Sequence, residues 1–130
     1  MTETVKSLVI GTSLTQDSDA IVRTGVALAR ATGASPWLVH AYSPLFIASG
    51  AGVDAMWTAE QVNGLQELIL DQAQRTGLSA LPTFSPDHIR LELGSPHREI
   101  VDLAQRVKAE LIVVGTHGRG FWIMDDVTPL

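Results

Sequence analysis

A glycine-rich motif directly after an apolar run is the part of this sequence best suited to chemistry. The run, residues 111–114, carries no charge, and the motif after it comprises Gly115, Thr116, His117, Gly118, Arg119 and Gly120. Glycines let backbone N–H groups approach an anion closely, and histidine and arginine add positive charge. The motif therefore predicts a cradle for a phosphate group. The same residues also fit a tight turn with exposed polar side chains, and both interpretations stay open.

Two other apolar runs end in small or polar residues: the first reaches Gly11 and is followed by Thr12 and Ser13, and the second ends at Ala41. Ligands of open α/β sheets bind just outside the carboxyl ends of the parallel strands. If the runs are such strands, these residues join the glycine-rich motif at one edge of the sheet. For His40 we expect a hydrogen-bonded ring at a strand end, with stacking on a base or a pH-dependent switch as alternatives.

Patterns for catalysis and metal binding are missing from the sequence. The absence of cysteine excludes thiolate nucleophiles and cysteine-ligated zinc or iron–sulfur sites. The histidines form no HExxH motif or other close ligand pair, so we expect no metal site. Neither a Gly-x-Ser-x-Gly elbow nor a P-loop is present. Asp17 and Asp19 are better explained as helix caps than as catalytic carboxylates, and we name no catalytic residue.

Length, composition and charge describe one ordinary globular domain. The 130 residues are 45% hydrophobic and 18% charged, enough for a sizeable core. A net charge of −5 argues against general binding to a nucleic-acid backbone. The N-terminus lacks a signal-peptide pattern, and no apolar stretch is long enough to span a bilayer. We expect a cytoplasmic protein without nucleic-acid or membrane partners.

Strand and helix patterns alternate along the chain. Buried strands are predicted at residues 7–11, 37–41 and 111–115, and a strand with one polar face at residues 89–93. The intervening helices carry capping signals at Asp17, Ser18 or Asp19 with Gly33, at Thr58 and Gln61 with Gly77, and at Ser95 with Pro96. This order predicts an α/β fold: an open, mainly parallel sheet with helices on both faces and right-handed crossovers.

Two segments lie outside this alternation. Residues 43–57 are predicted as a long loop rich in apolar side chains, which by default fold back on the core. Alternatively, that loop acts as a lid or a partner-binding patch. Residues 121–130 are predicted as a divergent tail after a domain of residues 1–120.

The chain resembles the universal stress protein family from about Lys6 to Gly120. The resemblance rests on Gly94-Ser95-Pro96, on residues 113–120 and on His40. It implies a fold like that of adenine-nucleotide hydrolases with strand order 3-2-1-4, commonly a homodimer, in a cytoplasmic stress response. It also implies a nucleotide across the ends of the first and fourth strands. Gly11, Thr12 and Ser13 would line the nucleoside side, Ala41 would lie near the base, and residues 115–120 would hold the phosphates.

The sequence also departs from that family. Its ATP-binding members carry Gly-x-x-Gly, nine residues, and then Gly-Ser or Gly-Thr. Gly115 and Gly118 match the first part, but Thr128 and Pro129 stand at the final pair, and proline has no N–H to offer a phosphate. Thr12 stands where the family usually has an aspartate. The family's final helix and fifth strand have no room after residue 120.

We therefore expect a stress-response binding or regulatory module that binds ATP or AMP weakly. The alternatives are an ATP hydrolase of the same superfold and a dimeric interaction protein that binds no nucleotide. The apolar strand at residues 111–115 would lie at a sheet edge and needs a cover. The candidates are the tail folded back, the same edge of a second subunit, or a partner's strand. We favour a homodimer with a contribution from the tail, and residues 43–57 are a second candidate surface for a partner.

Overall fold

The computed structural model describes the backbone of residues 7–42, 46–49, 52–55, 58–116 and 119–125, and the side chains of residues 7–42 and 58–115. The strands are β1 (Ser7–Gly11), β2 (Ser35–Tyr42), β3 (Phe46–Ser49), β4 (Gly52–Ala55), β5 (Ile89–Leu93), β6 (Ala109–Thr116) and β7 (Arg119–Asp125). The helices are α1 (Ser18–Thr32), α2 (Ala59–Arg75) and α3 (Pro96–Arg106), with short 3₁₀ turns η1 (Leu78–Ala80) and η2 (Pro86–His88).

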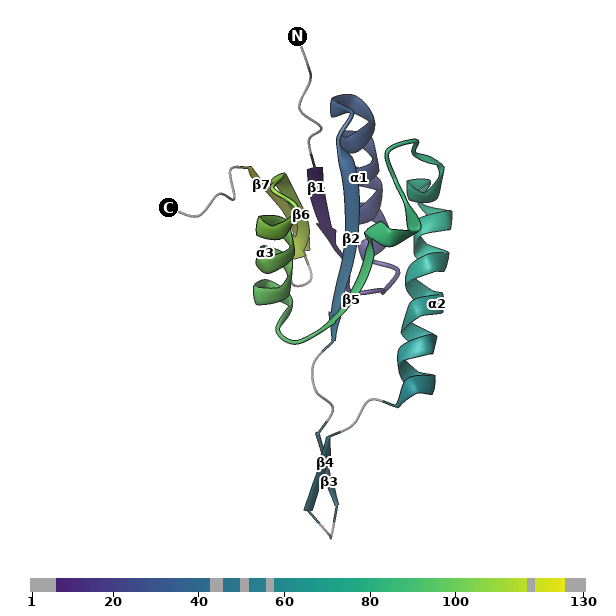
Figure 1. Ribbon diagram of the computed structural model, residues 1–130, viewed down its shortest axis with the longest axis vertical. Helices are drawn as coiled ribbons and strands as arrows, with labels where there is room; N and C mark the ends of the chain where they lie inside the picture. Colours follow the sequence, from purple (N-terminus) through teal and green to yellow (C-terminus); the bar gives the residue numbers. More distant parts are fainter. Residues whose placement is uncertain (1–6, 43–45, 50–51, 56–57, 117–118, 126–130) are drawn as a thin grey trace.

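The main sheet has the strand order β5-β2-β1-β6-β7 (Figure 1). β1 pairs in parallel with β2 and β6, and β2 pairs in parallel with β5. The four strands expected from the sequence therefore form a parallel sheet in the order 3-2-1-4, as predicted. The central position of β1 agrees with its composition, because a parallel strand buried on both faces needs apolar residues throughout.

Helices cover both faces of this sheet, with α1 and α2 on one side and α3 on the other (Figure 1). The core under α1 and α2 comprises Leu8, Ile10, Val22, Val26, Ala29, Ala34, Leu38, Ile69, Ala73, Leu78 and Leu81. The core under α3 comprises Val9, Val39, Leu103, Ala104, Ala109 and Ile112. Alternate residues of β1 enter the two cores, because successive strand side chains point to opposite faces.

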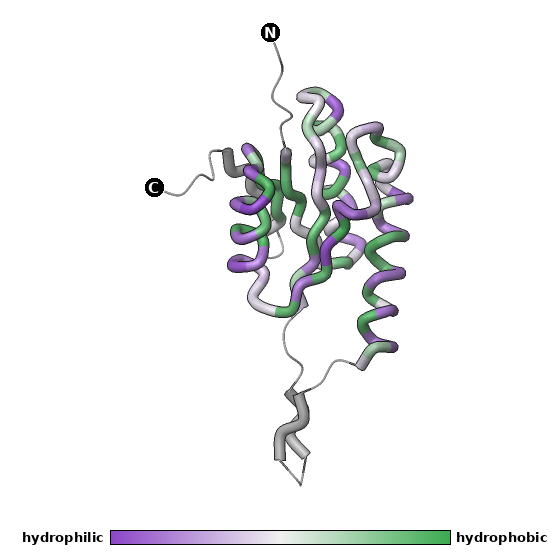
Figure 2. The backbone as a smooth tube through the Cα atoms, in the orientation of Figure 1, coloured by the Kyte–Doolittle hydropathy of each residue, from purple (hydrophilic) through white to green (hydrophobic). Residues whose placement is uncertain are grey.

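Hydrophobic residues concentrate in the central strands and on the helix sides that face them, while the sides of α2 and α3 that face away from the sheet are more polar (Figure 2). On α2, Leu68 is 51% exposed, whereas Ile69 and Ala73 are fully buried. In the part of the chain that the structure describes, no helix is long and apolar enough to cross a membrane.

The C-terminal segment forms a strand that the sequence pattern did not predict. β7 pairs antiparallel with β6, from Leu111 opposite Asp125 to Thr116 opposite Arg119. The sheet thus has a fifth strand, which is antiparallel and part of a hairpin with β6. It covers the edge of β6, so the tail folded back is the cover observed. The expectation that a partner pairs directly with residues 111–115 is corrected, because both edges of β6 are used within the chain.

The prediction of a loop at residues 43–57 is also corrected. β3 and β4 pair antiparallel with each other, from Phe46 opposite Ala55 to Ser49 opposite Gly52, as a separate two-stranded sheet. Only two residues separate these strands in the sequence, which is the length of a tight hairpin connection. The small residues around that connection carry no clear alternation of polar and apolar side chains, so the pattern gave little sign of a strand.

The predicted helix ends are confirmed in position. Gly33 ends α1 in the left-handed region, with φ of 76°, and donates its N–H to the carbonyl of Ala29. Thr58 and Gln61 form both halves of a capping box at the start of α2. Ser95 is the N-cap of α3, followed by Pro96, but its side chain makes no capping hydrogen bond. The side chains of Thr58 and Gln61 therefore cap α2 as predicted, whereas Ser95 marks the start of α3 by its position alone.

Of the three candidates for the N-cap of α1, Asp17 holds that position, whereas Ser18 and Asp19 lie within the helix. Asp17 is the N-cap residue of α1, but its conformation is helical and its side chain makes no capping hydrogen bond. Asp19 lies within the helix and reaches across to α2, where its carboxylate accepts hydrogen bonds from Gln72 Nε2 at 2.9 Å and Arg75 Nη1 at 2.5 Å. Asp19 thus joins two helices that are far apart in the sequence.

Two helix glycines have opposite surroundings. A Cβ added to Gly25 of α1 would lie 2.4 Å from Cδ1 of Ile10, whose side chain is fully buried in β1. A Cβ added to Gly64 of α2 would meet no atom within 4 Å. Gly25 therefore permits the close approach of α1 to the sheet, whereas Gly64 has only the entropic cost of glycine in a helix.

We predict opposite effects for alanine at these two positions. Gly25→Ala should lower the free energy of unfolding by about 1–3 kcal/mol, since overpacking a closed core strains it. Gly64→Ala should raise the free energy of unfolding by about 0.5–1 kcal/mol through helix propensity. Urea denaturation measures both, and adding Ile10→Val should recover part of the Gly25→Ala loss. Equal stability of the two alanine variants would contradict this packing.

We predict that the contribution of Asp19 to stability depends on pH. The hydrogen bond from Gln72, followed by the contacts with Arg75, lowers the pKa of Asp19 below its ordinary value of 3.8. The folded protein therefore favours the carboxylate, and this stabilisation is present above the unfolded pKa and lost as pH falls through the folded pKa. Asp19→Asn should lower the Tm at pH 7, and the difference from wild type should shrink below about pH 4. Asp17→Asn, at an exposed position beside it, is the control.

The pairing of β7 with β6 predicts the effect of removing residues 119–130. The deletion exposes unpaired N–H and C=O groups along an apolar strand, which invites pairing with another chain. Light scattering should show aggregation or a larger oligomer than the full chain forms. A truncated protein with the mass and solubility of the full chain would show that β6 needs no cover.

Candidate functional site

The carboxyl ends of β1 and β6 adjoin at the point where the chain changes the face of the sheet. The chain leaves β1 for α1 on one face, whereas α3 enters β6 from the other face. Such a switch point is where open α/β sheets form ligand-binding crevices. Ile10 lies opposite Val113, and Gly11 lies opposite Val39. Thr12 and Ser13 directly follow β1, while Ala41 and Gly115 lie near the carboxyl ends of β2 and β6. The structure therefore brings these predicted site residues to one end of the sheet.

The glycine-rich motif forms the connection between β6 and β7. Gly115 and Thr116 end β6, Arg119 and Gly120 begin β7, and the register shifts between Gly115 and Thr116. His117 and Gly118 lie outside the described residues. The motif thus lies where two paired strands are connected, and the tight turn and the phosphate cradle both stay predictions.

Gly11 is a packing glycine as well as a candidate site residue. A Cβ at this position would lie 2.7 Å from Cδ1 of Ile100 in α3 and 3.0 Å from Cγ1 of Val114 in β6. The missing side chain thus gives α3 its close approach to β1. Beyond Gly11, Ser13 is exposed, with its Oγ 2.9 Å from Oγ1 of Thr15. Ala41 is 9% exposed near the end of β2.

Thr12 uses all of its polar atoms inside the protein. Its N–H donates to the carbonyl of Val39 at 3.0 Å, and its own carbonyl lies 2.8 Å from Nδ1 of His40. Its hydroxyl oxygen lies 2.6 Å from Oε1 of Gln72 and accepts a hydrogen bond from the N–H of Leu14 at 3.0 Å. Thr12 is only 8% exposed, and its polar groups point into the protein. Thr12 therefore determines the backbone shape at the end of β1.

His40 has the hydrogen-bonded ring that the sequence analysis expected. A carbonyl oxygen can only accept, so the contact with Thr12 requires the proton of the neutral ring on Nδ1. In a regular parallel ladder the carbonyl of Thr12 would instead accept from the N–H of Ala41. The imidazole therefore replaces a backbone N–H as the hydrogen-bond donor to this carbonyl, at the point where β1 leaves the sheet.

Gln72 of α2 is the polar residue at this end of the sheet that the sequence analysis missed. It is 1% exposed, and its Nε2 donates to Ser18 Oγ at 3.0 Å and to Asp19 Oδ1 at 2.9 Å, while its Oε1 faces Thr12. No buried polar side-chain atom lacks a hydrogen-bond partner in the described part of the chain. The signal was a glutamine within the apolar stripe of α2, between Ile69 and Ala73.

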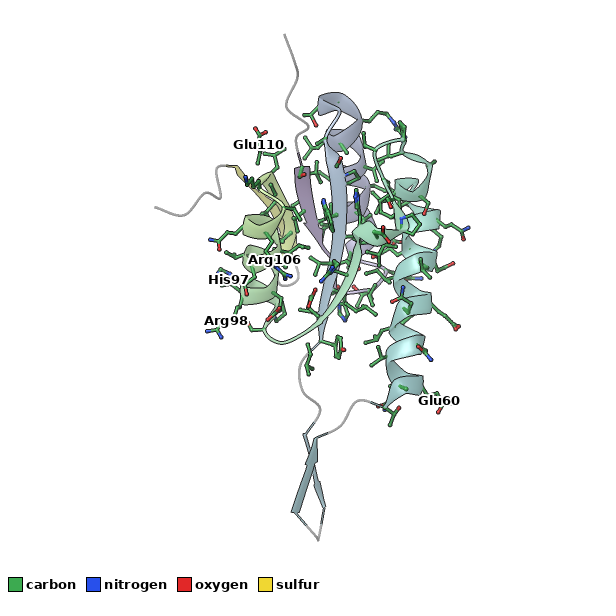
Figure 3. All side chains as sticks on the ribbon, in the orientation of Figure 1. Glu60, His97, Arg98, Arg106 and Glu110 are labelled. Atoms are coloured by element: carbon green, nitrogen blue, oxygen red, sulfur yellow. The ribbon has the colours of Figure 1, made fainter. Side chains whose placement is uncertain are left out.

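The described histidines lie on different elements: His40 on β2, His88 on η2 and His97 on α3. His88 stacks on Trp37 with ring centroids 4.2 Å apart, and its Nδ1 lies 3.0 Å from the carbonyl of Pro36. His97 lies on the outer side of α3, beside Arg98 (Figure 3). Among the described residues, no three histidines or carboxylates lie close enough together to hold a metal ion.

Several solved structures with this fold are universal stress proteins. One from Archaeoglobus fulgidus matches 90% of this chain and 80% of its own, with a TM-score of 0.66 and 20% identity. A universal stress protein in complex with cAMP matches 85% of this chain and 72% of its own, with a TM-score of 0.62 and 19% identity. A universal stress protein from Archaeoglobus fulgidus in complex with dAMP matches 84% of this chain and 79% of its own, with a TM-score of 0.58 and 18% identity.

The sequence matches no curated protein significantly. It does match the model of the universal stress protein family over residues 4–123. That match extends over the parallel strands, the three helices and most of β7. On this evidence the chain belongs to the universal stress protein family.

Proposed function

We propose that this protein binds an adenine nucleotide weakly at the carboxyl ends of β1 and β6. In this proposal it is a binding or regulatory module of a stress response rather than an enzyme. The observation that carries the proposal is the switch point between β1 and β6, with Ser13, Ala41 and Gly115 at the same end of the sheet. The cAMP and dAMP complexes of proteins with this fold support the choice of ligand.

The candidate residues divide into a nucleoside side and a phosphate side. Gly11, Thr12 and Ser13 line the nucleoside side, with Ala41 near the base. Because the polar atoms of Thr12 are engaged within the protein, Thr12 contributes shape, and Ser13 is the exposed polar side chain next to it. The motif from Gly115 to Gly120 holds the phosphates, with charge from His117 and Arg119.

Assembly and location are part of the same proposal. In this proposal the protein is a cytoplasmic homodimer, as is common in the universal stress protein family. β7 is the outer strand on its side of the sheet, so the contact between copies involves β7 rather than β6. This arrangement would satisfy the backbone groups on the outer edge of β7.

We predict a dissociation constant for ATP or AMP that is micromolar or weaker. Thr128 and Pro129 replace the Gly-Ser pair of the ATP-binding members, and each lost charge-assisted hydrogen bond costs about 1.5–3 kcal/mol, or roughly tenfold or more in affinity. Titration calorimetry measures the constant. A nanomolar constant would contradict the weak affinity, and the absence of both heat and a thermal shift would contradict nucleotide binding.

A matched pair of variants tests the location. Ser13→Glu places a carboxylate beside the proposed nucleoside and should weaken AMP binding at least tenfold, whereas Gln16→Glu adds the same charge farther along the exposed loop and should change it less than twofold. Phosphate release from ATP, measured in protein free of contaminating ATPase, should stay at the level of the blank. Sustained release that Ser13→Glu abolishes would favour the hydrolase alternative instead.

A further inference from the structure

Thr12 and Gln72, sixty residues apart, meet in a buried contact. Oγ1 of Thr12 lies 2.6 Å from Oε1 of Gln72 and 3.0 Å from Oγ of Ser18, so its single proton serves one of these two oxygens. Nε2 of Gln72 donates to Ser18 and Asp19. A fully buried carboxamide is retained only where its groups are satisfied, because an unpaired one is strongly unfavourable. This one connects α2 with the first residue after β1 and with the first turn of α1.

The loop held by this contact has an unusual backbone. Leu14 has φ of 64°, in the left-handed region that residues other than glycine rarely adopt. Its N–H donates to Oγ1 of Thr12 at 3.0 Å. The same Oγ1 is hydrogen-bonded to Gln72. Such a conformation persists only where the surroundings over-determine it. The orientation of the Thr12 hydroxyl, set by Gln72, is part of what determines it here.

The same threonine carries the contact with His40. The Thr12 carbonyl accepts from Nδ1 of the ring, which orients the imidazole and leaves Nε2 as its acceptor nitrogen. A shift of Thr12 would therefore alter the loop and the imidazole together. Both lie at the carboxyl ends of β1 and β2, where Ser13 and Ala41 also lie.

We propose that Gln72 is a positioning residue of the candidate nucleotide site, where it fixes the loop after β1 and, through Thr12, the ring of His40. This inference rests on the proposed function for its ligand, but its structural part is independent of any ligand. Gln72 itself touches no nucleotide in this proposal. The shape of the site therefore depends on α2, although no residue of α2 lines the site in this proposal.

The first experiment needs no ligand and uses NMR on the full chain. Gln72→Leu removes the carboxamide at similar volume, and Ile69→Val, one turn away in the same buried stripe, is the control for lost core stability. Relative to global unfolding, Gln72→Leu should speed hydrogen exchange at the Leu14 amide at least tenfold and shift the ring nitrogens of His40. Ile69→Val should change neither.

An exchanged pair provides a rescue. Gln72→Glu alone places a second carboxylate against Asp19 and should disturb the Leu14 amide as Gln72→Leu does. Adding Asp19→Asn places an amide N–H donor at position 19 opposite the carboxylate at position 72, which restores a hydrogen bond between the two side chains. The exchange rate at Leu14 should then return toward the wild-type value. Unchanged Leu14 exchange and His40 nitrogen shifts in both Gln72 variants would overturn the proposal, whatever their Tm.

The second experiment measures AMP affinity in the same variants by calorimetry. Gln72→Leu should weaken AMP binding at least fivefold relative to Ile69→Val. Wild-type affinity in Gln72→Leu would overturn the positioning role. If the wild-type protein binds no AMP, the proposed function fails, and the NMR measurement alone then decides whether Gln72 fixes the loop and the imidazole.

Discussion

The burial of β1 on both faces is the constraint on which the rest of this structure depends. Leu8, Val9 and Ile10 are completely inaccessible to solvent, so helices must cover the sheet on each side. α1 can approach closely because Gly25 leaves space for Ile10, and α3 can do so because Gly11 leaves space for Ile100. The two glycines therefore set the distance between the layers. The loop after β1 and the end of β6 lie at the same, carboxyl end of the sheet, because the two strands pair in parallel.

A parallel strand buried in this way also creates a polar problem at its carboxyl end. Where β1 leaves the sheet, its backbone loses ladder partners, and a buried backbone group without a partner is unfavourable. Side chains provide partners here. Nδ1 of His40 donates to the carbonyl of Thr12, and Oε1 of Gln72 accepts from the hydroxyl of Thr12. The end of the strand is thus held by β2 and α2 together. A site built there is attached to a rigid framework although it lies on a loop.

The opposite edge of the sheet shows how an apolar strand is protected. β6 has the composition of a central strand, yet the parallel part of the sheet ends with it. β7 returns antiparallel and satisfies that edge within the chain. The same hairpin places the glycine-rich motif at its turn. Protection of the edge and the position of the candidate phosphate-binding residues therefore come from one element.

Local patterns in the sequence determined the alternation of strands and helices, because runs of apolar residues, capping pairs such as Thr58 with Gln61, and glycines such as Gly33 act within a few residues of each other. They also placed Gly11, Ala41 and Gly115 at the carboxyl ends of strands. Only the tertiary structure decided what Gln72 and Asp19 do, since their partners lie more than fifty residues away. The pairing of β7 was decided in the same way, as a strand edge needs a partner but does not encode which segment supplies it. Periodicity fixes which side of an element is buried, whereas the identity of each buried contact depends on how whole elements pack together.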